Sequence, residues 1–299
     1  MTGSVSTLAQ IGFRPFFADQ LAELDGGLVP GRIAIAHGES YVVWTLDGPR
    51  KGVLPGRRVA AWRTAVERPQ VGDWVAGSYS GDAGALAIEH LLQRHTCLQR
   101  RAAGTRAEAQ VIAANVDVVG VVSALGEGGG DARDRRLINA ARLGRYVAAV
   151  EQSRARPVLI LNKSDLGGEP ASVVEMLGEH FPGVPVVLIS AQHGDGIDDL
   201  RARVGVGETL VMVGMSGVGK STLVNALLGR TAQDVGDVRA ADARGRHTTT
   251  HRELFLTESG ALLIDTPGMR EMGLWEPQES GVRLESESHL RGRRGRRRR

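Results

Sequence analysis

A glycine-rich segment late in the chain, Gly214-Met-Ser-Gly-Val-Gly-Lys-Ser221, separates the apolar run TLVMV from the helix-forming run STLVNALLG. Backbone N–H groups of such a loop surround a β-phosphate, the lysine reaches the β and γ oxygens, and the final hydroxyl ligates Mg²⁺. An incidental glycine turn rarely has a strand before it and a helix after it. The sequence therefore predicts a phosphate-binding P-loop within an α/β fold. The predicted phosphate-contacting residues are Gly214, Met215, Ser216, Gly217, Val218, Gly219, Lys220, Ser221 and Thr222.

A second motif, Asp265-Thr-Pro-Gly268, follows the apolar run ALLI. Taken alone, this tetrapeptide is also typical of a type I or II turn. In P-loop proteins, an aspartate at such a strand end holds the Mg²⁺ shell, and the glycine N–H contacts the γ-phosphate. We therefore expect Asp265 near the metal and Gly268 near the γ-phosphate.

The tetrapeptide Asn162-Lys-Ser-Asp165 closes the apolar run VLIL. An ionised Asp165 can accept hydrogen bonds from guanine N1–H and the exocyclic amine together, whereas adenine offers neither donor. Asn162 is expected to secure the loop and reach the O6/N7 edge, and the Lys163 stem to cover the base. By itself the tetrapeptide is also compatible with a capped turn. In a chain with a P-loop it predicts guanine recognition by Asn162, Lys163, Ser164 and Asp165.

Two weaker elements complete the predicted site. Ser190 and Ala191 follow the run PVVLI and are suited to place a backbone N–H near guanine O6. The segment Arg246-His-Thr-Thr-Thr250 lies between the P-loop helix and DTPG, where a loop threonine can reach Mg²⁺ and the γ-phosphate. Thr249 is the first choice for that ligand and Thr250 the second. His247 alone is equally compatible with a solvated loop histidine.

From Val116 onward, short apolar runs alternate with helical segments, which predicts a largely parallel sheet covered by helices on both faces. The P-loop, DTPG, NKSD and Ser190-Ala191 each follow a predicted strand, where such folds place their sites. The expected strands are VDVVGVVSAL, PVLILN, PVVLIS, ETLVMVG, RELFLT and ALLIDT, and DRRLINAARLGRYVAAVEQ has helical spacing.

Between Arg32 and Leu92, five β-like runs with Gly- and Pro-containing breaks predict a small closed barrel, with an OB-fold as first choice. These runs are RIAIAH, SYVVWTL, RRVAAW, GDWVAGSY and ALAIEHLL. Such barrels often bind nucleic acid through surface aromatic and basic groups. Alternatively, the aromatic residues are simply core and rim residues, and the pattern alone favours this interpretation. The residues in question are Tyr41, Trp44, Trp62 and Trp74.

These patterns divide the chain into an N-terminal extension (1–29), an OB-fold barrel (30–99), a P-loop domain (100–275) and an arginine-rich tail (276–299) that we expect to be disordered. The last nine residues, RGRRGRRRR, hold seven arginines, and without them the net charge of +3 becomes −4. The folded body is thus mildly acidic, so the overall charge does not indicate nucleic-acid binding.

Cys97 is the only cysteine, which excludes an internal disulfide framework and a zinc site of several cysteines. No apolar stretch approaches the roughly 18 residues that a membrane span needs, and the first 20 residues lack the pattern of a secretory signal. We therefore expect a cytoplasmic protein without a membrane partner, acting as a monomer.

In motif order, NKSD and SA precede GMSGVGKS, the HTTT loop and DTPG, whereas most GTPases have the P-loop first and the guanine motif last. With the strings GMSGVGKSTLVNALLG, GRHTTTHREL and DTPGMRE behind a five-stranded barrel, the chain resembles a circularly permuted GTPase. The resemblance is to the bacterial GTPases that depend on the small ribosomal subunit, the RsgA or YjeQ family. It covers about Arg32 to Leu274.

The resemblance implies an OB-fold that contacts small-subunit rRNA and a GTPase that the small subunit activates during its late maturation. Met269 stands where many GTPases carry a water-orienting glutamine. The resemblance assigns that work to His247, which makes His247 and Lys220 the expected catalytic residues and GTP, GDP and Mg²⁺ the expected ligands.

The family also continues into a helical C-terminal domain that holds zinc through cysteines and a histidine, whereas no cysteine follows Leu274 here. Zinc is therefore expected for the family but not for this sequence. The leading hypothesis is Mg²⁺-dependent hydrolysis of GTP to GDP and phosphate. The alternative is an rRNA-associated guanine-nucleotide-binding module that turns over little because the zinc domain is missing. A P-loop ATPase or kinase is disfavoured by NKSD.

Overall fold

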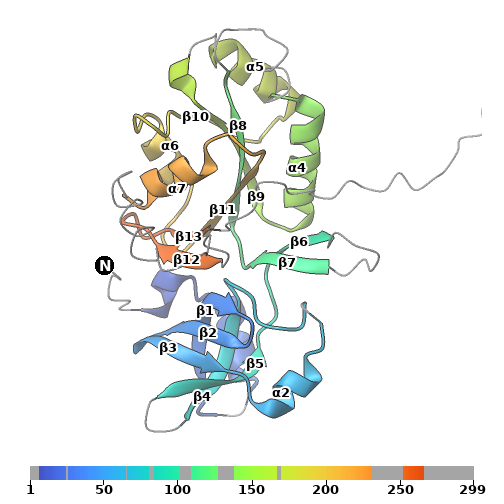
Figure 1. The fold of residues 1–299 in the computed structure, drawn as a ribbon, viewed down its shortest axis with the longest axis vertical. Coiled ribbons are helices and arrows are strands. Elements are labelled where there is room, and N and C mark those ends of the chain that lie inside the picture. The colour runs from blue at the N-terminus through green and yellow to red at the C-terminus, as the bar shows by residue number, and fades with distance from the viewer. Residues whose placement is uncertain are drawn as a thin grey trace, which may run out of the picture.

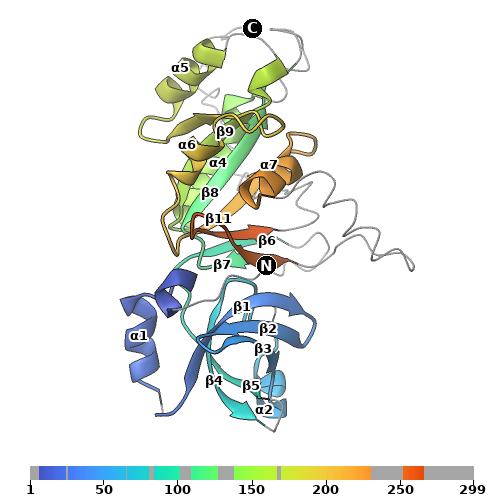
Figure 2. The same cartoon turned by 90° about the vertical axis from the view of Figure 1, so that its left-hand side faces the viewer.

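The protein divides into a small β-barrel at one end and an α/β part at the other (Figures 1 and 2). The structure is a computed structural model, and it describes residues 7–24, 26–64, 66–80, 84–101, 109–126, 138–166, 170–229 and 252–265. Within these ranges no helix is long and apolar enough to cross a membrane. The predicted tail, 276–299, lies outside them.

Five strands close the barrel in the order β1-β2-β3-β5-β4, with β4 pairing back onto β1. All neighbours are antiparallel except β3 and β5. This is a five-stranded closed barrel of the OB type, as the sequence predicts. Its strands are β1 (Val29–His37), β2 (Ser40–Thr45), β3 (Gly48–Val53), β4 (Trp74–Ser80) and β5 (Ala85–Leu91). The side chains that fill it are Ile33, Tyr41, Val43, Val75, Leu86 and Ile88.

One predicted barrel strand is wrong. The run RRVAAW forms helix α2 (Gly56–Ala61), in which the N–H of Trp62 donates to the carbonyl of Arg58. Pro55 precedes this helix, and its alanines favour helix. The third strand is instead GPRKGV, whose composition disfavours strand. A tight turn after Thr45 brings it back onto β2, with Gly48 at φ +96°.

The α/β part has the strand order β10-β9-β8-β11-β13-β12, in which only β12 runs antiparallel. This arrangement confirms the predicted α/β fold behind a barrel. Although β11 comes late in the chain, it lies at the centre of this sheet, beside the earlier strand β8. The strands are β8 (Val118–Ala124), β9 (Arg156–Asn162), β10 (Val186–Leu188), β11 (Thr209–Gly214), β12 (Glu253–Leu256) and β13 (Leu262–Asp265).

Alternate residues of the central strands face opposite helical layers, which explains why these strands are apolar throughout. In β11, Val211 and Val213 share a cluster with α4 (Ala140–Gln152) and Leu177 of α5 (Pro170–His180). On the other face, Leu210 and Met212 share a cluster with α6 (Ile197–Arg201) and α7 (Lys220–Leu227). The P-loop strand is therefore held rigidly from both sides.

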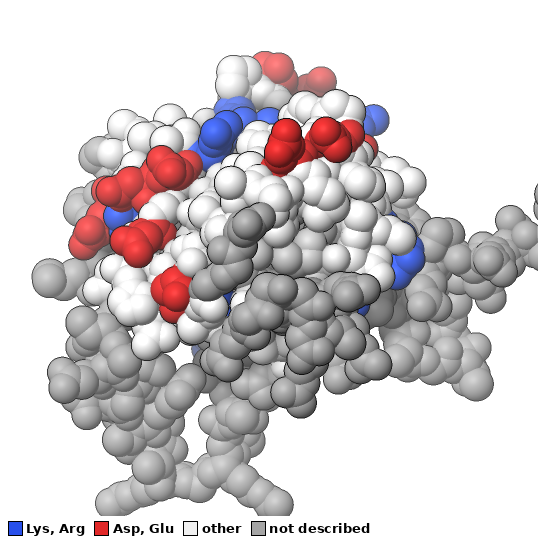
Figure 3. Space-filling model, turned by 90° about the horizontal axis from the view of Figure 1, so that it is seen from above, with Lys and Arg blue, Asp and Glu red and all other residues white. Residues whose placement is uncertain are grey.

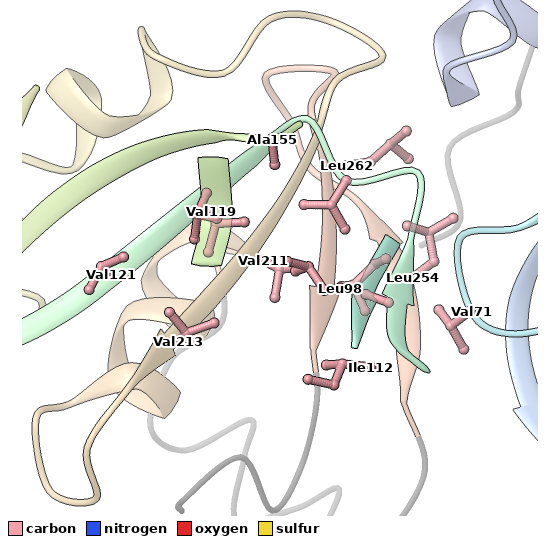
Figure 4. Packing of buried hydrophobic residues seen from close by; sticks show 14 of the residues in the cluster. Val71, Leu98, Ile112, Val119, Val121, Ala155, Val211, Val213, Leu254 and Leu262 are labelled. Carbon is pink, nitrogen blue, oxygen red and sulfur yellow. The ribbon is translucent and has the colours of Figure 1, made fainter. Parts of the chain in front are cut away.

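A two-stranded hairpin joins the barrel to the α/β part. It consists of β6 (Cys97–Arg101) and β7 (Ala109–Ala114), and sequence reasoning did not predict it. Figure 4 shows its residues Leu98 and Ile112 between Val211 of the central sheet and Val71 of the barrel side. A strand pairing between β1 and β12 makes a second connection, so the two parts share one continuous hydrophobic core.

The N-terminal segment forms two short helices against the barrel, η1 (Leu8–Ile11) and α1 (Pro15–Ala22) (Figure 2). Phe13 and Phe17 pack against Trp74, with ring centroids 4.8 and 5.8 Å apart. Trp74 and Tyr41 are fully buried, whereas Trp44 and Trp62 are half-buried. The interpretation of these four aromatics as core and rim residues therefore fits the structure.

Arg32 of β1 is buried where the N-terminal segment, barrel and central sheet meet, with 1% of its surface exposed. Its guanidinium donates to four oxygens from separate segments, and burial lowers its pKa to about 10. The acceptors are the carbonyls of Ile11 (2.6 Å), Gly72 (3.2 Å) and Asn115 (3.1 Å) and the hydroxyl of Thr209 (2.8 Å). Because Thr209 begins the P-loop strand, Arg32 ties the barrel directly to that strand.

We predict that Arg32→Met lowers the free energy of unfolding by about 3 kcal/mol or more, because buried oxygens lose their donor. Urea denaturation followed by circular dichroism measures this loss. Arg63→Met, at an exposed position of the barrel, is the matched control and should change stability by less than about 0.5 kcal/mol. Equal effects of the two substitutions would contradict the structural role of Arg32.

Candidate active site

The predicted motifs converge at one edge of the central sheet. Asn162 ends β9, Gly214 ends β11 and Asp265 ends β13, while Ser190 follows β10. Because these four strands are parallel, their carboxyl ends lie at the same edge, where α/β folds bind ligands. Segments far apart in the sequence therefore meet at one site.

The P-loop turns tightly from β11 into α7, which begins at Lys220. Three of its glycines have positive φ: Gly214 at +148°, Gly217 at +83° and Gly219 at +91°. A β-carbon on Gly214 would lie 2.2 Å from the carbonyl oxygen of Val122, so a side chain does not fit there. These glycines let the backbone turn its N–H groups toward a phosphate at the start of the helix.

Lys220 is held inside the loop that it is expected to serve. Its Nζ donates to the carbonyls of Gly214 (2.8 Å) and Met215 (2.5 Å). Ser221 and Thr222 follow on the first turn of α7 and are exposed, as are Ser216 and Gly217 in the loop. The mouth of the P-loop is therefore open to a ligand, and a cationic group already lies there.

A single buried amide joins the three parts of the site. The Asn162 side chain is 2% exposed, and its Nδ2 donates to the carbonyl of Val218 in the P-loop at 2.8 Å. Its Oδ1 accepts from the backbone N–H of Ala191 at 3.0 Å. A β-carbon on Gly219 would lie 2.2 Å from Nδ2, so the P-loop approaches this amide as closely as glycine allows. Asn162 thus links the P-loop to the segment at Ala191 through hydrogen bonds to both.

The turn after Asn162 presents Asp165. Lys163 has φ +64°, and the N–H of Ser164 donates to the carbonyl of Ile189 at 3.1 Å, so the turn is fastened to the neighbouring strand end. The hydroxyl of Ser190, in a residue that is fully buried, donates to Asp165 Oδ1 at 2.5 Å. This hydrogen bond is the main cause that lowers the pKa of Asp165, and it favours the ionised carboxylate that the predicted guanine contact would use.

His193 also belongs to this cluster, and sequence reasoning missed it. Its Nδ1 lies 3.0 Å from Ser190 Oγ and 3.9 Å from Asp165 Oδ2. The contact depends on a turn closed by Gly194 and Gly196, both at positive φ. The only signal in the sequence is a histidine inside a glycine-containing segment directly after Ser-Ala.

Several predicted site residues lie outside the described part of the chain, namely His247, Thr249, Thr250 and Gly268. Asp265 is the last described residue of its segment and pairs in register with Glu253 of β12. In the described ranges, no three His, Cys, Asp or Glu side chains cluster to hold a metal ion. The oxygen donors of Ser221 and Asp265 are of the type that Mg²⁺ prefers, so the residues present fit this ion.

A phosphate loop with a guanine motif at the same edge of the sheet defines a P-loop GTPase, here with the guanine motif earlier in the chain. The family described as RsgA GTPase matches residues 91–275. The small ribosomal subunit biogenesis GTPase RsgA of Opitutus terrae is 39% identical over 285 residues, which cover 92% of this chain and 75% of that relative. The protein of the same name from Streptomyces coelicolor is 39% identical over 279 residues, covering 91% and 71%.

Solved structures agree with this similarity. YjeQ from Thermotoga maritima superposes with a TM-score of 0.58 and 25% identity, covering 81% of this chain and 75% of that one. YloQ, described as a circularly permuted GTPase, has the same fold with a TM-score of 0.55 and 22% identity, covering 83% and 74%. The chain belongs to the RsgA GTPase family, and it is a GTP hydrolase of the circularly permuted kind.

Two P-loop glycines provide a matched test of the Asn162 contact. Gly217 and Gly219 both have positive φ, but a β-carbon meets nothing within 4 Å at Gly217 and meets Asn162 at Gly219. We expect Gly219→Ala to weaken GDP binding by at least about tenfold more than Gly217→Ala, because only the former displaces a buried hydrogen-bonded amide. Titration with a fluorescent GDP analogue measures both affinities. Equal losses would mean that the Asn162 contact does not support the site.

Proposed function

We propose that this chain hydrolyses GTP to GDP and phosphate during late maturation of the small ribosomal subunit, and that the subunit accelerates the reaction. The observation that carries the proposal is the Asn162 side chain, which bonds to both the P-loop and the Ser190-Ala191 segment. A base bound at Asp165 and phosphates bound at Lys220 would thus belong to one nucleotide. Membership of the RsgA GTPase family supports the same reaction. We propose that the protein acts in the cytoplasm as a monomer.

The proposed chemistry assigns a separate task to each segment. Backbone donors of the P-loop and Lys220 stabilise the negative charge that develops on the transferred phosphoryl group. Mg²⁺, when held by Ser221 and Asp265 with Thr249, would neutralise charge on the phosphate oxygens. We further propose that Gly268 contacts the γ-phosphate and that His247 orients the attacking water.

We also propose that the barrel contacts ribosomal RNA. The stretch from Arg50 to Arg68 contains one acidic residue, Glu67, and six basic residues, namely Arg50, Lys51, Arg57, Arg58, Arg63 and Arg68. The Arg50 guanidinium lies 5.7 Å from the ring centroid of Tyr79, which is 41% exposed. Exposed aromatic rings with arginines beside them suit stacking on unpaired bases and binding to phosphates.

The other end of the molecule has a different surface. Seen from above in Figure 3, the described surface carries prominent acidic side chains among basic and uncharged ones. The acidic groups on this surface disfavour contact with a phosphate backbone there. We therefore place the RNA-binding face on the barrel rather than on this end of the α/β part.

Steady-state GTP hydrolysis, measured with and without purified small ribosomal subunits, tests the proposed function. We expect slow hydrolysis alone and an increase in kcat on the order of 100-fold with small subunits, which is the effect of about one added transition-state donor. Lys220→Ala should abolish turnover in both conditions. His247→Ala should lower kcat with little change in KM, because orienting water matters in the transition state.

The controls separate this proposal from a passive nucleotide-binding module. Large ribosomal subunits at the same concentration should not stimulate hydrolysis. Tight GDP binding without any turnover, with or without small subunits, would contradict the proposed enzyme and favour the binding module. Turnover that survives Lys220→Ala would mean that a contaminating enzyme hydrolyses the GTP.

A further inference from the structure

We propose that His193 is a positioning residue for guanine recognition, which acts by directing the Ser190 hydroxyl onto Asp165. The inference rests on the proposed function, because it concerns how the same site discriminates the base. It adds a residue outside the predicted motifs to the determinants of specificity.

The three side chains form one hydrogen-bonded row. Ser190 Oγ lies 2.5 Å from Asp165 Oδ1 and 3.0 Å from His193 Nδ1. Ser190 is fully buried, whereas more than half of the His193 side chain is exposed, at 57%. The row therefore runs from the buried serine to a histidine at the surface, with the base-recognising carboxylate on its other side.

The backbone fixes the position of His193. The N–H groups of His193 and Gly194 both donate to the carbonyl of Ser190, at 3.2 and 2.8 Å. The N–H of Ser190 donates in turn to the carbonyl of Asp195 at 3.0 Å. A β-carbon at Gly196 would lie 2.0 Å from the carbonyl oxygen of Leu188, so the loop is packed directly against the strand end. A closed turn of this kind holds the backbone of His193 beside Ser190, and the imidazole Nδ1 lies 3.0 Å from the Ser190 hydroxyl.

The available protons determine the direction of both hydrogen bonds. Ionised Asp165 can only accept, and the Ser190 hydroxyl has one proton to donate. At 2.5 Å that proton must lie between Ser190 Oγ and Asp165 Oδ1, since two oxygens without a proton between them would repel each other. His193 Nδ1 must then carry a hydrogen and donate to Ser190 Oγ. His193 thus prevents the hydroxyl from turning away from Asp165.

This arrangement matters because guanine needs both oxygens of the carboxylate. Its N1–H and its exocyclic amine donate in parallel, so the carboxylate must lie in the plane of the base. The Ser190 hydrogen bond restrains Oδ1 and leaves lone pairs on both oxygens for the base. Without His193 the hydroxyl can adopt other rotamers, and the carboxylate can rotate out of plane. The hydrogen bond between the Asp165 carboxylate and the exocyclic amine should weaken most.

Inosine diphosphate isolates that second contact, because hypoxanthine keeps N1–H and O6 but lacks the exocyclic amine. We expect the wild-type chain to bind GDP about 10- to 100-fold more tightly than IDP, as one charge-assisted hydrogen bond provides. His193→Ala should reduce this ratio about three- to tenfold. If His193 only supported the loop structure, His193→Ala would weaken the binding of both nucleotides equally and leave the ratio unchanged.

Three further variants complete the experiment. His193→Asn retains an N–H donor close to the position of Nδ1 and should keep the ratio within about twofold of wild type. In a Ser190→Ala background, His193→Ala should have no further effect, because its route to Asp165 is already removed. Gln192→Ala, at the exposed neighbouring position, should leave the ratio unchanged. Isothermal titration calorimetry with GDP and IDP measures each ratio, and thermal unfolding verifies that each variant is folded.

The outcomes distinguish this inference from the proposed function. If the wild-type chain binds GDP and IDP equally, the guanine site itself is misplaced. If the wild type discriminates but His193→Ala has the same ratio, or His193→Asn loses discrimination as fully as His193→Ala, the positioning role of His193 is overturned. A ratio that His193→Ala reduces and His193→Asn restores supports the positioning role of His193.

Discussion

The nucleotide site depends on one buried amide. Asn162 uses both its donor and its acceptor on backbone groups of two other loops, the P-loop at Val218 and the loop at Ala191. A buried amide that lost either partner would incur the full cost of desolvation, roughly 1–3 kcal/mol, so the three loops are stable only together. Because the contacts form in space, the site does not depend on the order in which these loops occur in the chain. The strand that carries the guanine motif precedes the P-loop strand in sequence and is separated from it in the sheet by β8, yet the Asn162 side chain joins the two loops that follow these strands.

A second buried polar group, Arg32, couples the site to the barrel. Its four hydrogen bonds reach the N-terminal segment, the barrel, the connection to the central sheet and the first residue of the P-loop strand. Apolar packing through the β6–β7 hairpin reinforces this joint (Figure 4). The barrel and the P-loop strand are therefore joined by both polar and apolar contacts. A partner bound to the barrel would be positioned relative to the phosphate site rather than tethered loosely to it.

The site motifs give clearer local signals in the sequence than the barrel strands do, for physical reasons. Glycines and a lysine between a strand and a helix form a local signature, and buried parallel strands are continuous apolar runs. The third barrel strand, GPRKGV, has a single β-forming residue, Val53, and depends on pairing with its neighbours, whereas RRVAAW favours helix. The β6–β7 hairpin and the packing of Phe13 on Trp74 depend on tertiary contacts, as does the approach of His193 to Ser190.

We propose that Asp165 recognises guanine at the site that Asn162 assembles, and exchange of the base tests this proposal most directly. Asp165→Asn replaces one acceptor by a donor, which suits xanthine because xanthine carries a carbonyl where guanine carries an amine. Competition binding of GDP and XDP to this variant should show GDP weakened on the order of 100-fold and XDP preferred. If the variant still prefers GDP, the base is bound elsewhere and the account is wrong.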